Sequence, residues 1–241
     1  MTVRADLHVH SCLSPCGDLE NSPAAIARKA ASIGVDIVGL CDHNTALNCP
    51  AFRDACRREG IVGVYGLEVS TREEIHVLCL FETPDDAVAF GAELYPLLAE
   101  FPHDPVRFGD QVIVDVDEVI LGELEKSLFG AIDLPLSDIV AQTLERGGLS
   151  IPAHIDRTAH SIGSQIGFLP DEPFSAVEVT RDACEIQTGR FTRITNSDAH
   201  FLADIGARHF TFEARSAPFA ALARALRDDR VSMEFAPRAG G

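Results

Sequence analysis

The chain has 241 residues, of which 46% are hydrophobic, and a formal net charge of −17 at pH 7. This apolar content is enough for a sizeable core in one large domain. So acidic a composition argues against a general nucleic-acid binder, which needs a basic surface for the phosphate backbone. The sequence shows no apolar run of membrane-spanning length and no secretory signal pattern. Seven cysteines, an odd number without a repeated C-x-x-C pair, indicate reduced thiols in a cytoplasmic protein.

Strands and helices alternate along the first part of the chain. One helix is predicted to begin at the N-cap Ser22, with Pro23 in its first position, and to end at Gly34. The run "VDIVGLCDH" is apolar almost throughout, as expected of a strand buried on both faces. In chain order the pattern predicts strand 2–10, helix 22–34, strand 35–43, helix 49–60, strands 61–70 and 74–82, and helix 83–101.

A less regular region follows and is read as an insertion at about residues 102–135. Within it, "DQVIVDVDEVILG" predicts a β-hairpin that turns near residues 115–118. The alternation then resumes with helix 136–148, strands 149–155, 175–180, 191–200 and 209–214, helix 217–229 and strand 231–236. Repeated βα units predict one domain over 1–241, with a mostly parallel sheet covered by helices, closed as a barrel or open.

Polar side chains gather at the ends of the predicted strands. In a barrel of parallel strands, the carboxyl-terminal rim is where several strands deliver reactive side chains. Because residues two apart on a strand point the same way, His8 and His10 share one face. The strand-end residues are His8, His10, Asp42, His43, Glu68, His154, Asp198 and His200.

His76 begins its strand instead of ending it. The connection from Glu68 is too short for a parallel crossover, so we expect an antiparallel return. Such a strand starts at the rim where its predecessor ended, which places His76 beside Glu68.

Six imidazoles and several carboxylates on one rim are suited to two or three divalent cations. Any one of these histidines alone is more often a satisfied polar residue near a core. Burying all of them together without a compensating ion is costly. The sequence therefore predicts a metal site.

The segments "DLHVHS", "CDHN", "GLEVS", "IHVL", "PAHIDR" and "NSDAH" occur in the order found in the PHP (polymerase and histidinol phosphatase) superfamily, which the chain resembles over residues 5–213. The resemblance implies a distorted (β/α)7 TIM-like barrel that hydrolyses phosphoesters at a trinuclear centre. It implies a first metal held by His8, His10, Glu68 and Asp198, and a second held by Glu68, His76 and His154. His43 and His200 would hold a third, with a ligand from the loop after the first strand.

That loop departs from the family pattern, because "SPCGDLENSP" stands where many members read "SDG". Aligning Ser22-Pro23 with the family leaves Asp18 in the ligand position, and Cys16 is its competitor. A thiolate would favour zinc, whereas an oxygen ligand suits the manganese or magnesium that many phosphoesterases use. Ile155 replaces a frequent proline, with little expected consequence. Asp42 is expected to orient a neighbouring histidine or to accept hydrogen bonds in its turn.

The implied chemistry is attack on phosphorus by a metal-bridging hydroxide, with Mn, Zn, Fe or Mg as the metal. Glu68, Asp198 and Arg157 are the predicted catalytic residues, and Arg157 is placed to fork two phosphate oxygens. Weaker candidates for substrate contact are His160, Glu178 and Arg181.

The expected substrate is a small phosphomonoester or nucleotide, with the insertion capping the rim and no stable binding of duplex nucleic acid. With two tyrosines and no tryptophan, no aromatic stacking platform is evident. Two alternatives stay open. One is an amidohydrolase-like enzyme, although Lys29 and Lys126 are the chain's lysines and neither falls at a strand end to carry a carbamylated-lysine centre. The other is a non-catalytic, metal-binding regulatory module.

Overall fold

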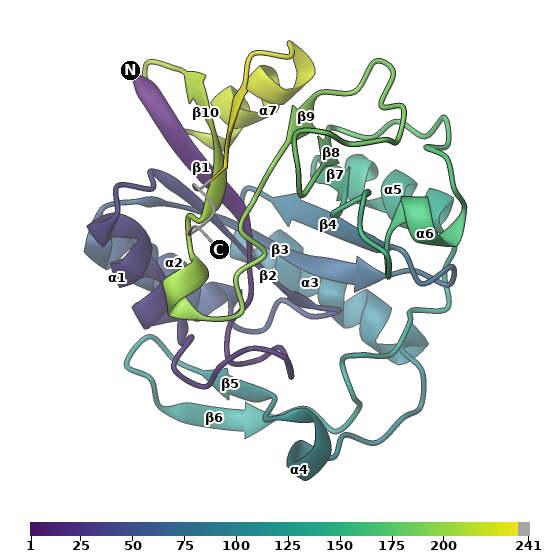
Figure 1. The fold of residues 1–241 in the computed structure, drawn as a ribbon. Helices are drawn as coiled ribbons and strands as arrows, with labels where there is room; N and C mark the ends of the chain where they lie inside the picture. Colours follow the sequence, from purple (N-terminus) through teal and green to yellow (C-terminus); the bar gives the residue numbers. More distant parts are fainter. Residues whose placement is uncertain (236–241) are drawn as a thin grey trace, which may run out of the picture.

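The computed structural model describes residues 1–235, so Ala236, the predicted end of the last strand, lies outside them with the rest of the chain's tail. Its main element is a seven-stranded mixed sheet in the order β11-β10-β1-β2-β3-β4-β7 (Figure 1). β1, β2 and β3 are parallel, while β4 runs antiparallel to β3 and β7, and β10 runs antiparallel to β1 and β11. The strands are β1 (Thr2–Val9), β2 (Ile37–His43), β3 (Val62–Ser70), β4 (His76–Phe81), β7 (Leu149–Pro152), β10 (Arg208–Glu213) and β11 (Ser232–Phe235).

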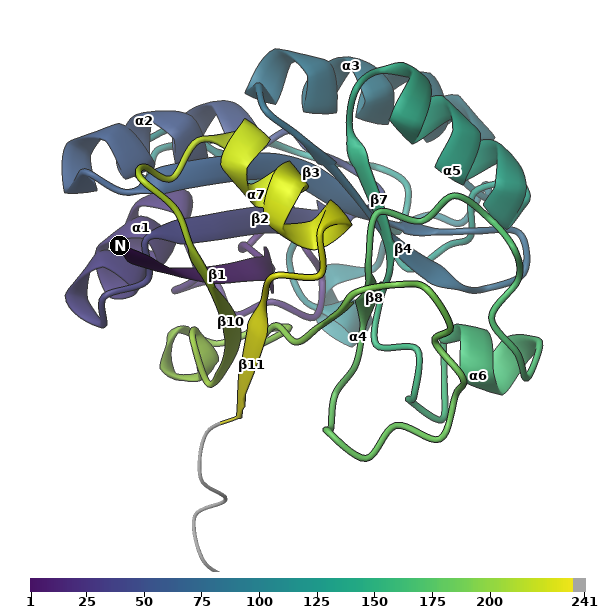
Figure 2. The same cartoon turned by 90° about the horizontal axis from the view of Figure 1, so that it is seen from above.

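Helices cover the outside of the curled sheet. Figure 2 shows the helices that follow β1, β2, β4 and the insertion lying one after another around one face. A fifth, α7, packs through Leu222 and Leu226 with the cluster on the opposite, inner face. The helices are α1 (Pro23–Ser32), α2 (Cys49–Glu59), α3 (Pro84–Leu94), α5 (Leu136–Glu145) and α7 (Phe219–Arg227).

Both faces of the sheet are buried. On β2, Val38 and Leu40 belong to the apolar cluster under the outer helices, whereas Ile37 and Cys41 belong to the inner cluster. Every residue of β2 is buried, which confirms the prediction of a strand covered on both sides.

The start of α1 follows the predicted signals. The Ser22 hydroxyl accepts a hydrogen bond from the amide of Ala25, and Pro23 occupies the first turn. Gly34 lies just past the end of the helix with a φ of 74°, a left-handed conformation that glycine adopts without strain.

The predicted distorted (β/α)7 TIM-like barrel is confirmed as an α/β fold with a curled sheet but not as a full barrel, because the sheet is open. β8 (Val177–Glu178) and β9 (Arg193–Ile194) form a separate parallel pair. Two contacts of β1 explain why the sheet does not close into a barrel. Its amino-terminal half pairs with β10, and farther along the Leu7 amide donates to the side-chain oxygen of Asn196 instead of a backbone carbonyl. Near the rim, a single β-bridge from Val9 to Ala199 joins the end of β1 to the segment that follows β9.

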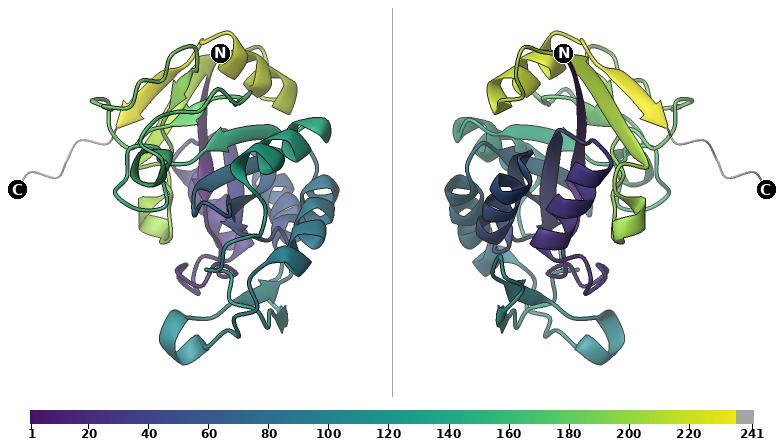
Figure 3. Two further views of the ribbon diagram at one scale, coloured as in Figure 1. Left: turned by 90° about the vertical axis from the view of Figure 1, so that its right-hand side faces the viewer. Right: turned by 90° about the vertical axis from the view of Figure 1, so that its left-hand side faces the viewer.

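The predicted hairpin of the insertion is present. β5 (Val112–Val114) and β6 (Ile120–Glu123) pair antiparallel, and the Asp115 amide donates to the Val119 carbonyl across the turn. A short helix, α4 (Pro105–Phe108), precedes the hairpin. Both lie at one end of the molecule, opposite the N-terminus (Figure 3).

The helix predicted over 83–101 is shorter in the structure. α3 ends at Leu94 and continues as a 3₁₀ turn, η1 (Tyr95–Leu97), because Pro96 has no N–H to donate to the carbonyl four residues before it. Two further short elements are α6 (Ile162–Gln165) and η2 (Leu202–Asp204).

All seven cysteines are free thiols. Within residues 1–235, no helix is long and apolar enough to cross a membrane.

Candidate metal centre

The site lies where the parallel strands end, and its first two histidines depend on an irregularity in β1. The register of β1 against β2 shifts between Asp6 and Val9. Leu7 therefore belongs to the inner cluster while Val9, two residues on, belongs to the outer one. A bulge of this kind re-aims side chains. It places His8 and His10 side by side, both fully buried, as the sequence predicts.

Strand alternation delivers the next three side chains to the inner face. Cys41 on β2 and Leu78 on β4 point inward, so His43 and His76, each two residues away, do as well. Leu67 and Val69 point outward, which leaves Glu68 between them facing inward. β4 returns antiparallel with Ser70 opposite His76, and Nδ1 of His76 lies 3.0 Å from Oε1 of Glu68, which confirms the expected antiparallel return.

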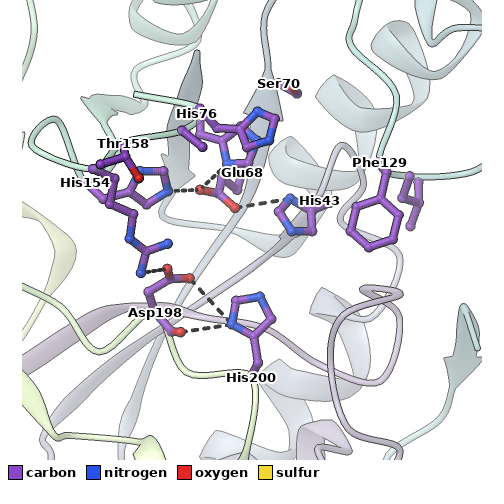
Figure 4. Close-up of a pocket in the computed structure, with 13 residues that line it drawn as sticks. His43, Glu68, Ser70, His76, Phe129, His154, Thr158, Asp198 and His200 are labelled. Carbon is purple, nitrogen blue, oxygen red and sulfur yellow. Dashed lines mark hydrogen bonds and ion pairs between the residues drawn. The ribbon is translucent and has the colours of Figure 1, made fainter. Parts of the chain in front are cut away.

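His154 and Asp198 follow strands and reach the site through unusual backbone conformations. Their φ angles are 33° and 52°. Positive φ is uncommon for residues other than glycine and costs free energy, and such residues cluster at functional sites. Both turn the chain so that their side chains face the same centre (Figure 4).

Glu68 is the hub of the site and is almost completely buried. Its Oε1 lies 3.0 Å from Nδ1 of His76, 3.1 Å from Nε2 of His154 and 3.3 Å from Nε2 of His8. Its Oε2 lies 3.1 Å from Nδ1 of His43 and 3.4 Å from Nε2 of His10. One carboxylate therefore touches five of the six imidazoles.

Asp198 is the second carboxylate of the site. Its Oδ1 lies 3.3 Å from Nε2 of both His8 and His10, and 3.7 Å from Nδ1 of His200. Together these side chains make three overlapping sets whose donor atoms lie within 4.8 Å of one another: His8, His10 and Asp198; His10, His43 and His200; and His43, Glu68 and His76.

Burial and neighbouring charges shift the pKa values of the site's carboxylates and imidazoles. Burial opposes ionisation of Glu68, but the imidazoles of His76, His8 and His43 outweigh it and hold the pKa of this carboxyl well below its usual range. Burial also opposes the charge on His10, but hydrogen bonds with Asp198 and Glu68 raise its pKa to about 9.

Two other imidazoles are shifted the opposite way. Burial lowers the pKa of His43 well below its usual range and that of His200 to about 4. Neutral imidazoles beside ionised carboxylates are the protonation states that metal ligands need.

Buried groups behind the ligands fix which ring nitrogen faces the centre. Nδ1 of His8 lies 2.9 Å from Oε2 of Glu178. The Ser14 hydroxyl donates to Oδ1 of Asp42 at 2.7 Å and thus accepts from Nδ1 of His10 at 3.0 Å. Asp42 therefore acts on His10 through Ser14. With both Nδ1 atoms protonated, the Nε2 atoms of His8 and His10 carry lone pairs, as metal-ligating histidines do.

This donor set fits divalent cations. Nε2 of His8 and Nε2 of His10 lie 3.1 Å apart, where a bound cation would take the place of the proton that His10 holds without metal. Nδ1 of His154 is buried and has no hydrogen-bond partner within residues 1–235. Imidazole nitrogens and carboxylate oxygens suit zinc, iron and manganese. A bound cation would satisfy donors that the protein leaves unpaired.

The centre opens into a cavity of about 290 Å³. Arg157 lines it, and Nη2 of this arginine lies 2.5 Å from Oδ2 of Asp198. His160 also lines it and stacks on His76, with ring centroids 4.8 Å apart. Of the weaker sequence candidates, His160 is therefore at the cavity wall, and Arg157 is in direct contact with the centre.

Other predicted residues are placed differently. Asp18 is in none of the three donor sets; its amide donates to the His200 carbonyl and its Oδ1 accepts from the Glu20 amide. Cys16 faces the same region, and its thiol pKa is raised by burial and by the charge of Glu68. The loop ligand thus stays a prediction.

Glu178 and Arg181 do not line the cavity. Glu178, predicted to contact substrate, is fully buried behind His8. Arg181 is exposed and pairs with Asp156. The sequence does not distinguish Glu178 from Arg181, because both stand at the end of a strand. Which of them is buried depends on the neighbouring loops.

Three contributors escaped the sequence reasoning. Ser14 gave no signal beyond being a serine four residues after His10. Asn44, within the quoted "CDHN", has a φ of 54° and donates to the carbonyls of Leu128 and Gly130. Phe129, from the insertion, lies beside His43 at the cavity wall (Figure 4).

Comparison with known proteins gives a match to one family over part of the chain, and several relatives. Residues 6–108 match the PHP domain family. The chain is 36% identical over 83 residues to the 5'-3' exoribonuclease of Haemophilus influenzae, a stretch that covers 33% of this chain and 29% of that enzyme.

Solved structures share the fold. The lesion-specific endonuclease Q of Pyrococcus furiosus superimposes with a TM-score of 0.69 at 19% identity, over 95% of this chain and 56% of that one. Endonuclease Q in complex with a 27-mer duplex substrate gives 0.67 at 19% identity, over 95% and 57%. A protein of Bifidobacterium adolescentis classed as a metal-dependent phosphoesterase gives 0.58 at 14% identity, over 95% and 96%. The chain thus spans less than two thirds of the exoribonuclease and of endonuclease Q.

These relatives correct the expectation of a small phosphorylated substrate without stable duplex binding. A protein with this fold holds duplex DNA, and the relative found by sequence is a ribonuclease. The error came from the net charge of −17, which describes the whole surface and includes the carboxylates that would ligate cations.

The family match begins two residues before His8 and takes in His10, His43, Glu68 and His76. It covers the part of the chain that supplies most of the converging donors, and it agrees with the order of the motifs. The resemblance read from the sequence is confirmed over residues 6–108, which match the PHP domain family.

Proposed function

We propose that this chain is a metal-dependent phosphoesterase that hydrolyses phosphodiester bonds in nucleic acid. The observation that carries the proposal is the convergence of six imidazoles on Glu68 and Asp198 at the floor of a cavity whose wall includes Arg157. Acidic and imidazole donors gather cations, and cations attract a phosphate that the acidic protein would otherwise repel.

The size of the cavity limits what enters it. At about 290 Å³ it lies at the low end of ligand sites, which hold roughly 300–1,000 Å³. A phosphate with its adjoining sugar fits such a volume. The remainder of a nucleic-acid strand would lie outside, on the surface around the opening.

The protein's own groups have distinct tasks. Bound divalent cations would lower the pKa of water and neutralise charge on the phosphate oxygens. Glu68 and Asp198 would hold these cations, together with the imidazoles. The Arg157 guanidinium, now on Asp198, is 41% exposed and can turn to bind two phosphate oxygens. Glu178 and Ser14 keep His8 and His10 in the tautomer that ligates.

The relatives support this substrate class. An endonuclease and an exoribonuclease both cut phosphodiester backbones. The amidohydrolase-like alternative finds less support, because neither lysine reaches the cavity. Lys126 Nζ instead donates to the carbonyls of Tyr95 and Leu98 and pairs with Glu100.

The test is hydrolysis of end-labelled oligonucleotides with manganese, magnesium or zinc added. The panel contains single-stranded DNA, duplex DNA, a duplex with an abasic site and single-stranded RNA, beside nucleoside monophosphates. We expect cleavage of at least one oligonucleotide, its loss in Asp198→Asn, and its retention in the exposed control Glu185→Gln. Phosphate release from the monophosphates alone would overturn the proposal.

A further inference from the structure

Three phenylalanines of the insertion and its flank lead away from the metal centre. The ring centroid of Phe129 lies 6.1 Å from that of His43, Phe108 lies 6.0 Å from Phe129, and Phe101 lies 6.1 Å from Phe108. We call Phe101, Phe108 and Phe129 the aromatic ledge. Figure 4 shows its first ring beside His43, on the side away from Glu68.

The ledge leaves aromatic surface uncovered. Phe101 is 50% exposed and Phe129 is 48% exposed. The rings meet edge to face, at interplanar angles of 65° and 68°, which fixes their orientation relative to one another. Exposed apolar surface that is contiguous and borders a functional site marks a binding surface.

The ledge also has a positive charge beside it. The Arg107 guanidinium carbon lies 5.4 Å from the centre of the Phe108 ring. Aromatic faces with an arginine nearby are what single-stranded nucleic acid binds, because every base has a π face and every nucleotide has a phosphate.

The backbone under the ledge is tied to the metal centre. The Asn44 side chain, next to His43, donates to the carbonyls on either side of Phe129. The Ser127 amide donates to the Phe101 carbonyl at 2.7 Å, and the Leu128 amide donates to the Gln111 side chain at 2.8 Å. The rings are therefore held in place relative to the site before any ligand arrives.

We propose that the aromatic ledge stacks unpaired bases of the strand whose backbone enters the metal centre. This inference rests on the proposed function and names its substrate more closely, as a nucleic acid with unpaired bases beside the scissile phosphate. The sequence gives no sign of the platform, because its three rings come from positions 101, 108 and 129 and from a residue type common in cores.

The test compares two single strands with the same number of phosphates, one with all its bases and one made of abasic residues. Fluorescence anisotropy measures binding of cleavage-resistant phosphorothioate versions to the metal-loaded protein. We expect Phe108→Ala and Phe101→Ala each to weaken binding of the base-bearing strand by about tenfold, since one stacked base contributes roughly 1–3 kcal/mol. The abasic strand should bind each variant as it binds the wild type.

Two further variants control for packing. Phe108→Tyr keeps an aromatic face and should bind the base-bearing strand as the wild type does. Val106 belongs to the same short helix and is 94% exposed. Val106→Ala removes this apolar side chain and should not change the affinity for either strand.

The outcomes separate the two proposals. Equal weakening on both strands, or no weakening on either, overturns the ledge, while cleavage of natural oligonucleotides by the wild type would still uphold the function. Base-dependent binding without any cleavage upholds the ledge and overturns the hydrolysis. A wild type that neither binds nor cleaves a strand contradicts both.

Discussion

His8 and Glu178 form a buried pair in which Nδ1 of the histidine lies 2.9 Å from Oε2 of the glutamate, and neither side chain is exposed. Because Glu178 accepts the Nδ1 proton, Nε2 of His8 faces Glu68 and Asp198. We predict that Glu178→Gln lowers metal affinity about 10- to 100-fold, as loss of a ligand's hydrogen-bond partner does elsewhere. Titration of the metal-free protein against a competing chelator measures this affinity.

The matched control for that experiment is Glu185→Gln, which removes a carboxylate seven residues away on the surface. Its metal affinity should equal that of the wild type. An unchanged affinity in Glu178→Gln would show that Glu178 does not position His8 for ligation.

Ser14 connects Asp42 to His10 and also accepts a hydrogen bond from the His43 amide at 3.2 Å. Ser14→Ala should therefore reduce metal affinity and hydrolysis about tenfold, because His10 loses the acceptor that fixes its tautomer. The fold should persist, with a loss of about 1–3 kcal/mol in the free energy of unfolding in urea.

Ser216→Ala, at an exposed serine, serves as the control and should alter neither quantity. If Ser14→Ala lost stability but kept full metal affinity, the hydroxyl would be part of the packing and not of the ligand's support.

The metal-free protein should lose stability as the pH rises. Burial opposes the charge on His10, but Asp198 and Glu68 raise its pKa to about 9 from an ordinary 6.5. The folded state therefore binds a proton that the unfolded state has released, and this stabilisation is complete below pH 6.5 and lost as the pH passes 9. The pKa of His200 is lowered to about 4, so this imidazole binds its proton more tightly in the unfolded state. It therefore lowers the stability of the folded state only below about pH 6.5.

We expect the free energy of unfolding of the chelated protein to fall by roughly 2–3 kcal/mol across that window. Urea unfolding at the two ends of the window measures it, and His10→Gln should reduce the difference, while His8, whose pKa is raised by Asp198, Glu178 and Glu68, keeps the same sign. A stability that rose with pH would contradict the sign. With metal bound, the cation takes the proton's place, so the fall should be much smaller.

Much of the arrangement of the candidate metal donors could be predicted because strand geometry is local. His43, Glu68 and His76 face inward by simple alternation, and the short link from Glu68 to His76 fixed the direction of β4. His8 and His10 were placed together correctly, although a bulge in β1 produces that arrangement.

The rest depended on contacts between distant segments. The barrel stays open because β10 takes the amino-terminal half of β1 and Asn196 bonds to Leu7 by its side chain. Glu178 was sorted with possible substrate contacts because a sequence does not show which strand-end carboxylate is covered. The ledge brings together rings as far apart in sequence as positions 101 and 129.

Arg157 gives the sharpest test of substrate binding as opposed to metal binding. Its Nη2 contacts Oδ2 of Asp198 and the guanidinium lines the cavity, but a guanidinium has no free lone pair with which to bind a metal. We predict that Arg157→Gln lowers kcat/KM about 10- to 100-fold while metal affinity stays within about twofold, since one charged hydrogen-bonded contact to phosphate contributes roughly 1.5–3 kcal/mol.

Arg157→Lys should recover only part of the loss, because an ammonium group cannot bind two phosphate oxygens in a fork. Arg181→Gln is the matched control, since Arg181 pairs with Asp156 outside the cavity and should leave kcat/KM unchanged. A parallel loss of metal affinity in Arg157→Gln would mean that the arginine serves to hold Asp198 in place. Full recovery by lysine would mean that a single positive charge is enough, and that the fork geometry has no part in binding phosphate.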